Sequence, residues 1–152
     1  MFMQKKEISA GAIIYQIKNN QILFLVEHMS LGHFTFAKGH LQNDETLEEG
    51  ALREIKEETS LDVILDTNFK YMIQYAPDKN NLNNIKDVYY FVAKVKNNKQ
   101  IAKDDHDNEV CEILFLNFQN TLKILTYQND KDALVSANQY ILKKENLYDL
   151  VK

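Results

Sequence analysis

The sequence predicts an α/β fold in which helices cover the faces of a mixed β-sheet. Apolar runs typical of strands alternate along the chain with segments of helical periodicity, and neighbouring strand-like runs are close enough to pair as a meander. The 152 residues are 45% apolar and include 8 Phe and 8 Tyr, enough to fill one core. We therefore expect a single domain over residues 1–152, with a mixed rather than an all-parallel sheet.

The first elements are two strands, expected at residues 8–15 and 21–28, because both runs are rich in Ile, Val and Phe. The polar residues 18–20 between them predict a hairpin. Residues 32–43 contain Gly, His and Lys and are expected to form a loop. Residues 46–59 form the clearest helix of the first half, because Thr46 and Glu49 make a capping box ahead of an apolar repeat.

The second half continues with strands at residues 63–75 and 87–95, joined by a polar connection at residues 77–86. In the later strand, Val88, Tyr90 and Val92 share one face, and the residues between them share the other. A short strand is expected at residues 112–116. Residues 130–144 carry apolar side chains at helical spacing and predict a closing helix.

Composition and charge exclude several classes of protein. The net charge of −4 gives no global basic field, so we expect no stable nucleic-acid partner. The single cysteine, Cys111, excludes an internal disulfide and a Cys-based zinc site, and we expect it to be buried. The apolar runs are too short to cross a membrane and the N-terminus lacks the features of a secretory signal, which predicts a cytoplasmic protein without a membrane partner.

The segment of residues 39–61, GHLQNDETLEEGALREIKEETSL, carries the residues best suited to chemistry. Glu54, Glu57 and Glu58 lie three and four residues apart, so their carboxylates project from one side of the predicted helix. Like charges at this spacing oppose a helix by a few tenths of a kcal/mol per pair, and a divalent cation would reverse that penalty. Taken alone, the pattern is more typical of a solvated acidic face than of a metal site.

The flanking residues favour the metal-binding interpretation. Gly39, Glu45 and the run that starts at Arg53 follow the spacing G-x5-E-x7-R-E-U-x-E-E-x-G-U, where U is aliphatic. The single departure is Ser60, at a position where glycine would readily adopt a positive φ. That departure concerns the turn after the helix and none of the carboxylates. The pattern is the Nudix box, and the segment resembles the Nudix hydrolases.

This resemblance implies a Nudix-type α/β/α sandwich that binds Mg²⁺ or Mn²⁺ and hydrolyses a nucleoside diphosphate linked to another group. It implies that Glu54, Glu57 and Glu58 are metal ligands and that Glu57 or Glu58 also serves as a base. Arg53, which would orient a glutamate, completes the catalytic set. Glu45 would support the loop. Arg53 is the only arginine among the 18 basic residues.

Residues outside the box are similar to the asymmetric diadenosine tetraphosphate hydrolases of this family, over residues 7–142. Residues 33–40, HFTFAKGH, resemble H-W-x-x-P-K-G-H, with Ala37 in place of proline, and residues 86–93, KDVYYFVA, resemble K-x-V-x-Y-F/W-L-A. Glu109 falls at the place of a late glutamate and is expected as a further metal ligand. The resemblance implies substrate contacts from eight residues, namely His33, Lys38, Gly39, His40, Tyr75, Lys86, Tyr90 and Tyr127.

Each outer residue also has a structural interpretation. The histidines and Lys38 could belong to an ordinary loop surface, Lys86 to a solvated strand end, and Glu109 to the solvated acidic run of residues 104–109. Tyr75 and Tyr127 are more often core or boundary aromatics than platforms for a base.

The substrate that the resemblance implies is a nucleotide polyphosphate, attacked in line by an activated water. The subfamily match implies cleavage of diadenosine tetraphosphate to ATP and AMP. The alternatives are an RNA 5′-pyrophosphohydrolase, a nucleoside-triphosphate pyrophosphohydrolase, and a catalytically silent sensor that binds a nucleotide.

Overall fold

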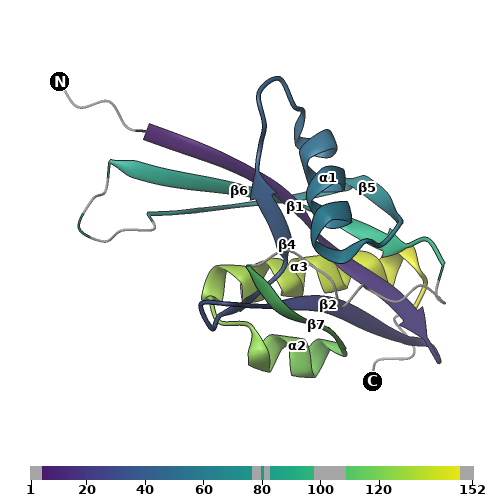
Figure 1. Cartoon of the computed structure of the whole chain (residues 1–152). Helices are drawn as coiled ribbons and strands as arrows, with labels where there is room; N and C mark the ends of the chain where they lie inside the picture. The colour runs from purple at the N-terminus through teal and green to yellow at the C-terminus, as the bar shows by residue number, and fades with distance from the viewer. Residues whose placement is uncertain (1–4, 77–79, 81–82, 98–108, 148–152) are drawn as a thin grey trace.

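A mixed β-sheet with helices on both faces is the framework of this protein (Figure 1). The computed structural model describes residues 5–76, 80, 83–97 and 109–147, and within them seven strands form one sheet. The strands are β1 (Lys5–Lys18), β2 (Gln21–Met29), β3 (Phe34–Thr35), β4 (Ala37–His40), β5 (Val63–Tyr75), β6 (Asn84–Val95) and β7 (Val110–Leu116). The helices are α1 (Leu47–Thr59), α2 (Phe118–Ile124) and α3 (Gln128–Lys144).

The predicted hairpin is confirmed by the antiparallel pairing of β1 with β2, in which Tyr15 lies opposite Phe24. Asn19 and Asn20 form the connection, with φ angles of 54° and 61°. Positive φ at both central residues suits the right-handed twist of the two strands, and asparagine tolerates that conformation better than most residues.

Strand β1 lies at the centre of the sheet, parallel to β6 and antiparallel to β2 and β4. Strand β4 approaches β1 very closely, because a Cβ on Gly11 would overlap the carbonyl oxygen of Ala37. The prediction of a loop at residues 32–43 is therefore wrong in part, since β3 and β4 lie within it. These strands have two and four residues, too few to show a periodic pattern.

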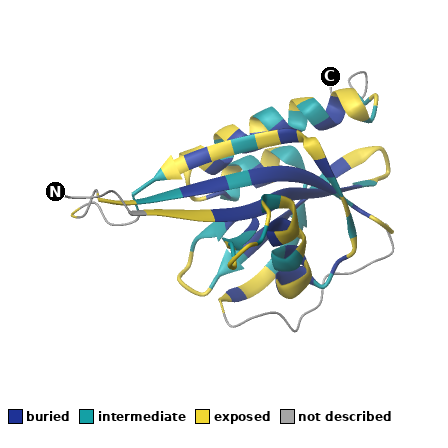
Figure 2. Ribbon diagram, turned by 90° about the horizontal axis from the view of Figure 1, so that it is seen from above, coloured by how far each residue is buried: buried dark blue, intermediate teal, exposed yellow. Residues whose placement is uncertain are grey.

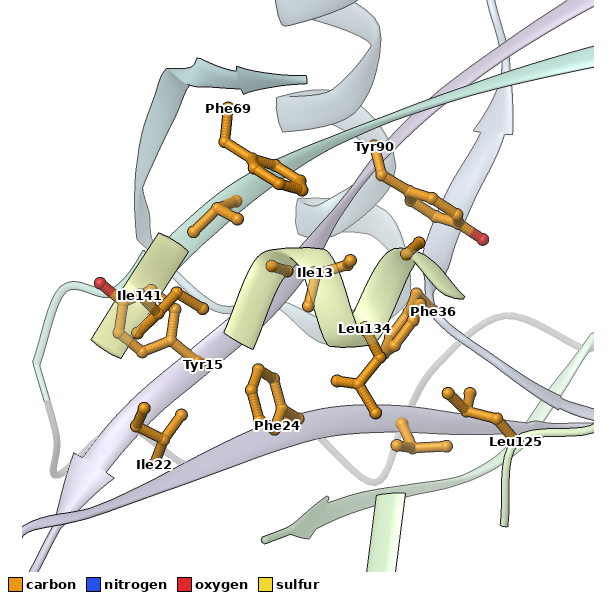
Figure 3. Close-up of a cluster of buried hydrophobic side chains, with 14 of the residues drawn as sticks. Ile13, Tyr15, Ile22, Phe24, Phe36, Phe69, Tyr90, Leu125, Leu134 and Ile141 are labelled. Carbon is orange, nitrogen blue, oxygen red and sulfur yellow. The ribbon is translucent and has the colours of Figure 1, made fainter. Parts of the chain in front are cut away.

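The alternation of side chains along β6 divides the core into two layers, as predicted. Val88, Tyr90 and Val92 pack in a cluster with residues of α3, including Leu134 and Ile141 (Figure 3). Phe91, Ala93 and Val95 instead pack with Ala51 and Ile55 of α1. Most residues along the middle of the central strands are accordingly buried (Figure 2). The α/β/α sandwich and its mixed sheet are confirmed.

The predicted helix and capping box at Thr46 are confirmed in α1. The Glu49 amide donates to the Thr46 hydroxyl at 3.1 Å, and the Thr46 amide donates to the Glu49 carboxylate at 3.1 Å. The helix ends at Ser60, which has φ 60° and donates its amide to the Lys56 carbonyl. The serine therefore keeps the left-handed turn that the Nudix pattern assigns to glycine, although this conformation disfavours an L-residue by about 1–2 kcal/mol.

The later elements extend or correct the sequence prediction. Strand β6 begins at Asn84, and residues 77–79 and 81–82 of the predicted connection lie outside the described residues. The short helix α2 was not predicted. The expectation that Cys111 is buried is wrong, because this side chain is exposed on β7, next to the buried Val110. Of the helices in the described part of the chain, none has the length and apolar character that crossing a membrane requires.

The conformation of Ser60 generates a testable prediction. Glycine adopts positive φ without a Cβ clash, so Ser60→Gly should raise the free energy of unfolding by about 0.5–1 kcal/mol, after the greater entropy of glycine in the unfolded chain is counted. Urea denaturation measures this change. Ser60→Ala is the control, because alanine keeps the strain and should give no gain. A Ser60→Gly variant less stable than wild type would contradict the argument.

Candidate active site

The guanidinium of Arg53, on α1, forms hydrogen bonds to several acceptors of the predicted metal-binding segment. Its Nε and one terminal nitrogen donate to the two Glu45 oxygens at 2.7 and 2.9 Å, a bidentate pair. The other terminal nitrogen donates to Glu54 at 2.8 Å and to Glu57 at 3.2 Å. Arg53 also donates to the carbonyl oxygen of His40 in β4 at 2.9 Å. One side chain thus joins α1, the loop before it and β4.

Electrostatics and hydrogen bonding reinforce this arrangement. Hydrogen bonds from Arg53 lower the pKa of Glu45 from 4.5 to about 2, with a further contribution from the Gln42 amide. Bonding to Glu45 in turn raises the pKa of Arg53 above its already high value. Glu45 therefore stays ionised over the physiological range and holds the loop before α1 in place.

Gly39 provides the space in which the Glu54 carboxylate lies. A Cβ built on Gly39 would fall within the carboxylate group of Glu54. The Glu54 side chain is 15% exposed, whereas the Glu57 side chain is 53% exposed. Glu58 is 4% exposed and lies one turn after the buried Ile55. The three carboxylates are therefore present along one side of α1 at different depths.

The donor set fits a hard divalent cation. All three groups offer carboxylate oxygens, which Mg²⁺ and Mn²⁺ prefer, and the missing side chain of Gly39 leaves room for one of them. Within the described residues, no three His, Cys, Asp or Glu side chains already converge on one point. Arg53 offsets the charge of Glu54 and Glu57 in this arrangement.

A second feature is a cavity of about 460 Å³ on the α3 side of β4. Its walls come from the loop before β3, from β4, from the facing ends of β5 and β6, and from the start of α3. The lining residues are His33, Thr35, Lys38, Ile73, Tyr75, Ala76, Lys86, Tyr127, Asn129 and Asp130. Tyr75 and Lys86 lie directly opposite each other on β5 and β6.

Aromatic rings and positively charged side chains line this cavity. Tyr127 is 52% exposed, and its ring lies 5.6 Å from that of His33 at a tilt of 53°. Burial and the positive charge of Lys38 lower the pKa of His33, so its ring is neutral at physiological pH. Burial and the negative charge of Asp130 raise the pKa of Tyr75, which keeps that phenol neutral.

A backbone connection fixes the position of Tyr127 relative to His33. The Phe34 amide donates to the Thr126 hydroxyl at 2.8 Å, and the Thr126 amide donates to the Phe34 carbonyl at 3.2 Å. The start of β3 is thereby joined to the loop before α3, and His33 and Tyr127, which adjoin the two bonded residues, both line the cavity.

The structure brings five of the eight predicted substrate-binding residues together at the cavity, namely His33, Lys38, Tyr75, Lys86 and Tyr127. Gly39 and His40 lie on β4 beside α1 instead. Tyr90 is fully buried, with its hydroxyl bonded to Asp130 at 2.9 Å, so its phenol lies beneath the cavity and has no open face for a substrate. Glu109 is exposed just before β7, and residues 104–108 of its acidic run lie outside the described residues.

Sequence reasoning missed three polar residues of the cavity, namely Thr35, Asn129 and Asp130. The Thr35 hydroxyl donates to the Asp130 carboxylate at 2.7 Å, although 95 positions separate them. Asp130 is only 2% exposed. A threonine between two phenylalanines was the available signal for Thr35. Nothing in the sequence distinguishes Asp130 from a solvated carboxylate in the first turn of a helix.

Comparison with known proteins identifies the family. The Nudix domain model matches residues 5–137, which include the whole Arg53 cluster and the cavity. The chain belongs to the Nudix family. Its α1 is therefore the Nudix helix, and the cavity lies on the opposite side of β4 from it.

Several solved structures have the same fold. The C. elegans Ap4A hydrolase in a binary complex matches with a TM-score of 0.80 at 24% identity, over 90% of this chain and 98% of that chain. The E. coli dihydroneopterin triphosphate pyrophosphohydrolase matches with a TM-score of 0.65 at 16% identity, over 84% and 91%. The Nudix domain of Shewanella oneidensis NrtR, complexed with ADP ribose, matches at 0.69 and 14%, over 91% and 90%. Identities this low establish the fold and not the substrate.

The Glu45–Arg53 pair generates a prediction about pH. Because the pKa of Glu45 falls from 4.5 to about 2 on folding, its ionised form stabilises the protein above pH 4.5, and this contribution is lost as the pH falls towards 2. Glu45→Gln should therefore melt below wild type at neutral pH, and the difference should shrink between pH 4.5 and 2. Thermal melts over this range measure it. Glu48→Gln, a change at an exposed position in the first turn of α1, is the control. A constant difference at all pH values would contradict the assignment.

Proposed function

We propose that this Nudix protein is a hydrolase that cleaves diadenosine tetraphosphate asymmetrically, to ATP and AMP, with a divalent cation. The observation that carries the proposal is the division of the site by β4. Lys38 extends to Thr35 in the cavity on the α3 side, while the next residue, Gly39, adjoins Glu54 on the α1 side. A substrate that uses both sides must be long, with a base at one end and phosphates that reach past β4.

The cavity has the composition expected for an adenine and the first phosphates. Tyr127 and Tyr75 offer ring faces, and stacking a base on one such ring contributes about 1–3 kcal/mol. Lys38 and Lys86 supply two ammonium groups in the same space. Within the described residues, β4 pairs with no strand other than β1, so no strand covers its other edge, past which a polyphosphate would have to cross.

The carboxylates of α1 suit the hydrolytic step. Glu54, Glu57 and Glu58 would hold Mg²⁺ or Mn²⁺, which would supply charge neutralisation for the phosphates and acidify the attacking water. Arg53 keeps Glu54 and Glu57 oriented along the helix. Glu57 or Glu58 would accept the proton of the water as it attacks phosphorus. The exposure of Glu57 favours it, because its side chain is 53% exposed and so the most accessible of the three to water.

Three other proposals use the same residues in part. An RNA 5′-pyrophosphohydrolase or a nucleoside-triphosphate pyrophosphohydrolase would need the carboxylates and lysines but one base site only. The likeness to dihydroneopterin triphosphate pyrophosphohydrolase supports the second of these. A silent sensor would bind a nucleotide without the need for the carboxylates on α1.

Product analysis in ¹⁸O-labelled water tests the proposal. Diadenosine tetraphosphate should give ATP and AMP, with label in one product only, and removal of divalent cations should abolish turnover. Glu58→Gln keeps the shape of the side chain, removes one negative charge, and serves as the inactive control. Formation of two ADP molecules would exclude asymmetric cleavage. Faster turnover of triphosphorylated RNA or of nucleoside triphosphates would favour those alternatives, and binding without turnover would indicate a sensor.

The exposure of Tyr127 gives a second test. Since 52% of its surface is accessible, Tyr127→Ala should leave the melting temperature nearly unchanged. Loss of a stacking face should raise KM for diadenosine tetraphosphate roughly ten-fold or more. Val135→Ala shortens an exposed side chain of α3, the helix that Tyr127 precedes, and it should change neither quantity. A large fall in melting temperature with an unchanged KM would make Tyr127 a structural residue.

A further inference from the structure

The buried carboxylate of Asp130 is connected to the ammonium of Lys38 through one hydroxyl group. The Thr35 hydroxyl donates to the Asp130 Oδ2 atom at 2.7 Å, and the Lys38 Nζ donates to the Thr35 oxygen at 2.8 Å. A hydroxyl has a single proton, and here the carboxylate accepts it. The lone pairs of the Thr35 oxygen therefore face Lys38, which fixes the direction of the whole chain of bonds.

A second donor holds the carboxylate from the other side. The Tyr90 hydroxyl donates to the Asp130 Oδ1 atom at 2.9 Å. The Tyr90 ring is fully buried and packs edge-on against Phe36, with 5.6 Å between ring centres, and its hydroxyl points out of the apolar cluster (Figure 3). Rotation of the carboxylate would leave buried hydroxyl groups without acceptors, so its orientation is fixed by both neighbours.

We propose that Asp130 is a positioning residue, which holds the Lys38 ammonium in place through Thr35 to receive a substrate phosphate. The inference rests on the proposed function, because a nucleotide polyphosphate is the ligand that Lys38 would meet. Lys38 uses one of its three N–H donors on Thr35 and retains the others for phosphate oxygens. A lysine side chain has many rotamers, so ordering it before the ligand arrives reduces the entropy lost on binding.

The charge of Asp130 fits this role. Among the described residues, no lysine or arginine forms a direct ion pair with this carboxylate. Two hydroxyl groups stabilise its charge directly, and Lys38 is the cation connected to one of them. A purely structural role would use the same bonds only to fasten α3 to β3. In the positioning role, removal of Thr35 weakens ligand binding through Lys38. In the structural role, the effects of Thr35 and Lys38 on ligand binding are independent.

A double-mutant cycle separates the two roles. Thr35→Val keeps the side-chain shape and removes the hydroxyl, and Lys38→Met removes the ammonium. We expect each change to raise KM for diadenosine tetraphosphate roughly ten-fold, with kcat changed by less than about three-fold. The double variant should be no worse than Lys38→Met alone, because both changes break the same connection. Effects that multiply would overturn the proposal.

Conservative and control variants complete the kinetic experiment. Thr35→Ser keeps the hydroxyl and should behave as wild type, whereas Asp130→Asn should raise KM as Thr35→Val does. Asp132→Asn is the matched control, because Asp132 is exposed on the same helix, outside the cavity lining, and accepts a hydrogen bond from Gln128. Melting temperatures identify any variant that does not fold. Thr35→Ala, which makes the same deletion with less bulk, then replaces Thr35→Val.

A measurement on the ligand-free protein tests the positioning role of Asp130 without knowledge of the substrate. Side-chain NMR of ¹⁵N-labelled lysine should detect an ordered Lys38 ammonium in wild type and in Thr35→Ser, and lose that order in Thr35→Val and Asp130→Asn. If the order is the same in all four proteins, the proposal is wrong. If wild type neither binds nor hydrolyses the nucleotides, the proposed function fails, and the NMR result alone decides whether Asp130 positions Lys38.

Discussion

The close approach of β4 to β1 is the constraint on which the site depends. A Cβ on Gly11 would overlap the Ala37 carbonyl and the Lys38 backbone, so this approach is open only to glycine. Neighbouring residues of a strand point to opposite faces, and β4 at this position sends Lys38 towards α3 and brings Gly39 against α1. The positions of both the cavity and the carboxylate cluster therefore depend on the path of one short strand, β4.

Arg53 holds the same strand from the α1 side. Its guanidinium donates to the His40 carbonyl at the end of β4 while it pairs with Glu45, Glu54 and Glu57. Only a planar group with five N–H donors can serve all these acceptors at once, and a lysine ammonium has neither the number nor the fork geometry. This explains in physical terms why a chain with 18 basic residues uses its single arginine at this position.

The sequence predicted those features that local patterns determine. The long strands, α1 with its capping box and α3 follow from periodicity and cap residues, and the spacing of the Nudix box predicted the carboxylates of α1. Strands β3 and β4 and helix α2 were missed because they are short and form through distant contacts, such as the pairing of Phe34 with Thr126. Thr35 and Asp130 were missed for the same reason, since their place in the site depends on a hydrogen bond between residues far apart in the chain.

The two sides of β4 also differ in charge, which bears on the order of events in the proposed reaction. The cavity presents Lys38 and Lys86, with His33 neutral because burial and Lys38 lower its pKa. The α1 side presents carboxylates whose charge a single arginine offsets, in a protein of net charge −4. A polyphosphate is attracted to the first side and repelled by the second unless cations lie between the two sets of oxygens. In the proposed reaction, nucleotide and metal would then be coupled ligands, and because linkage is reciprocal, each would strengthen the binding of the other by the same factor.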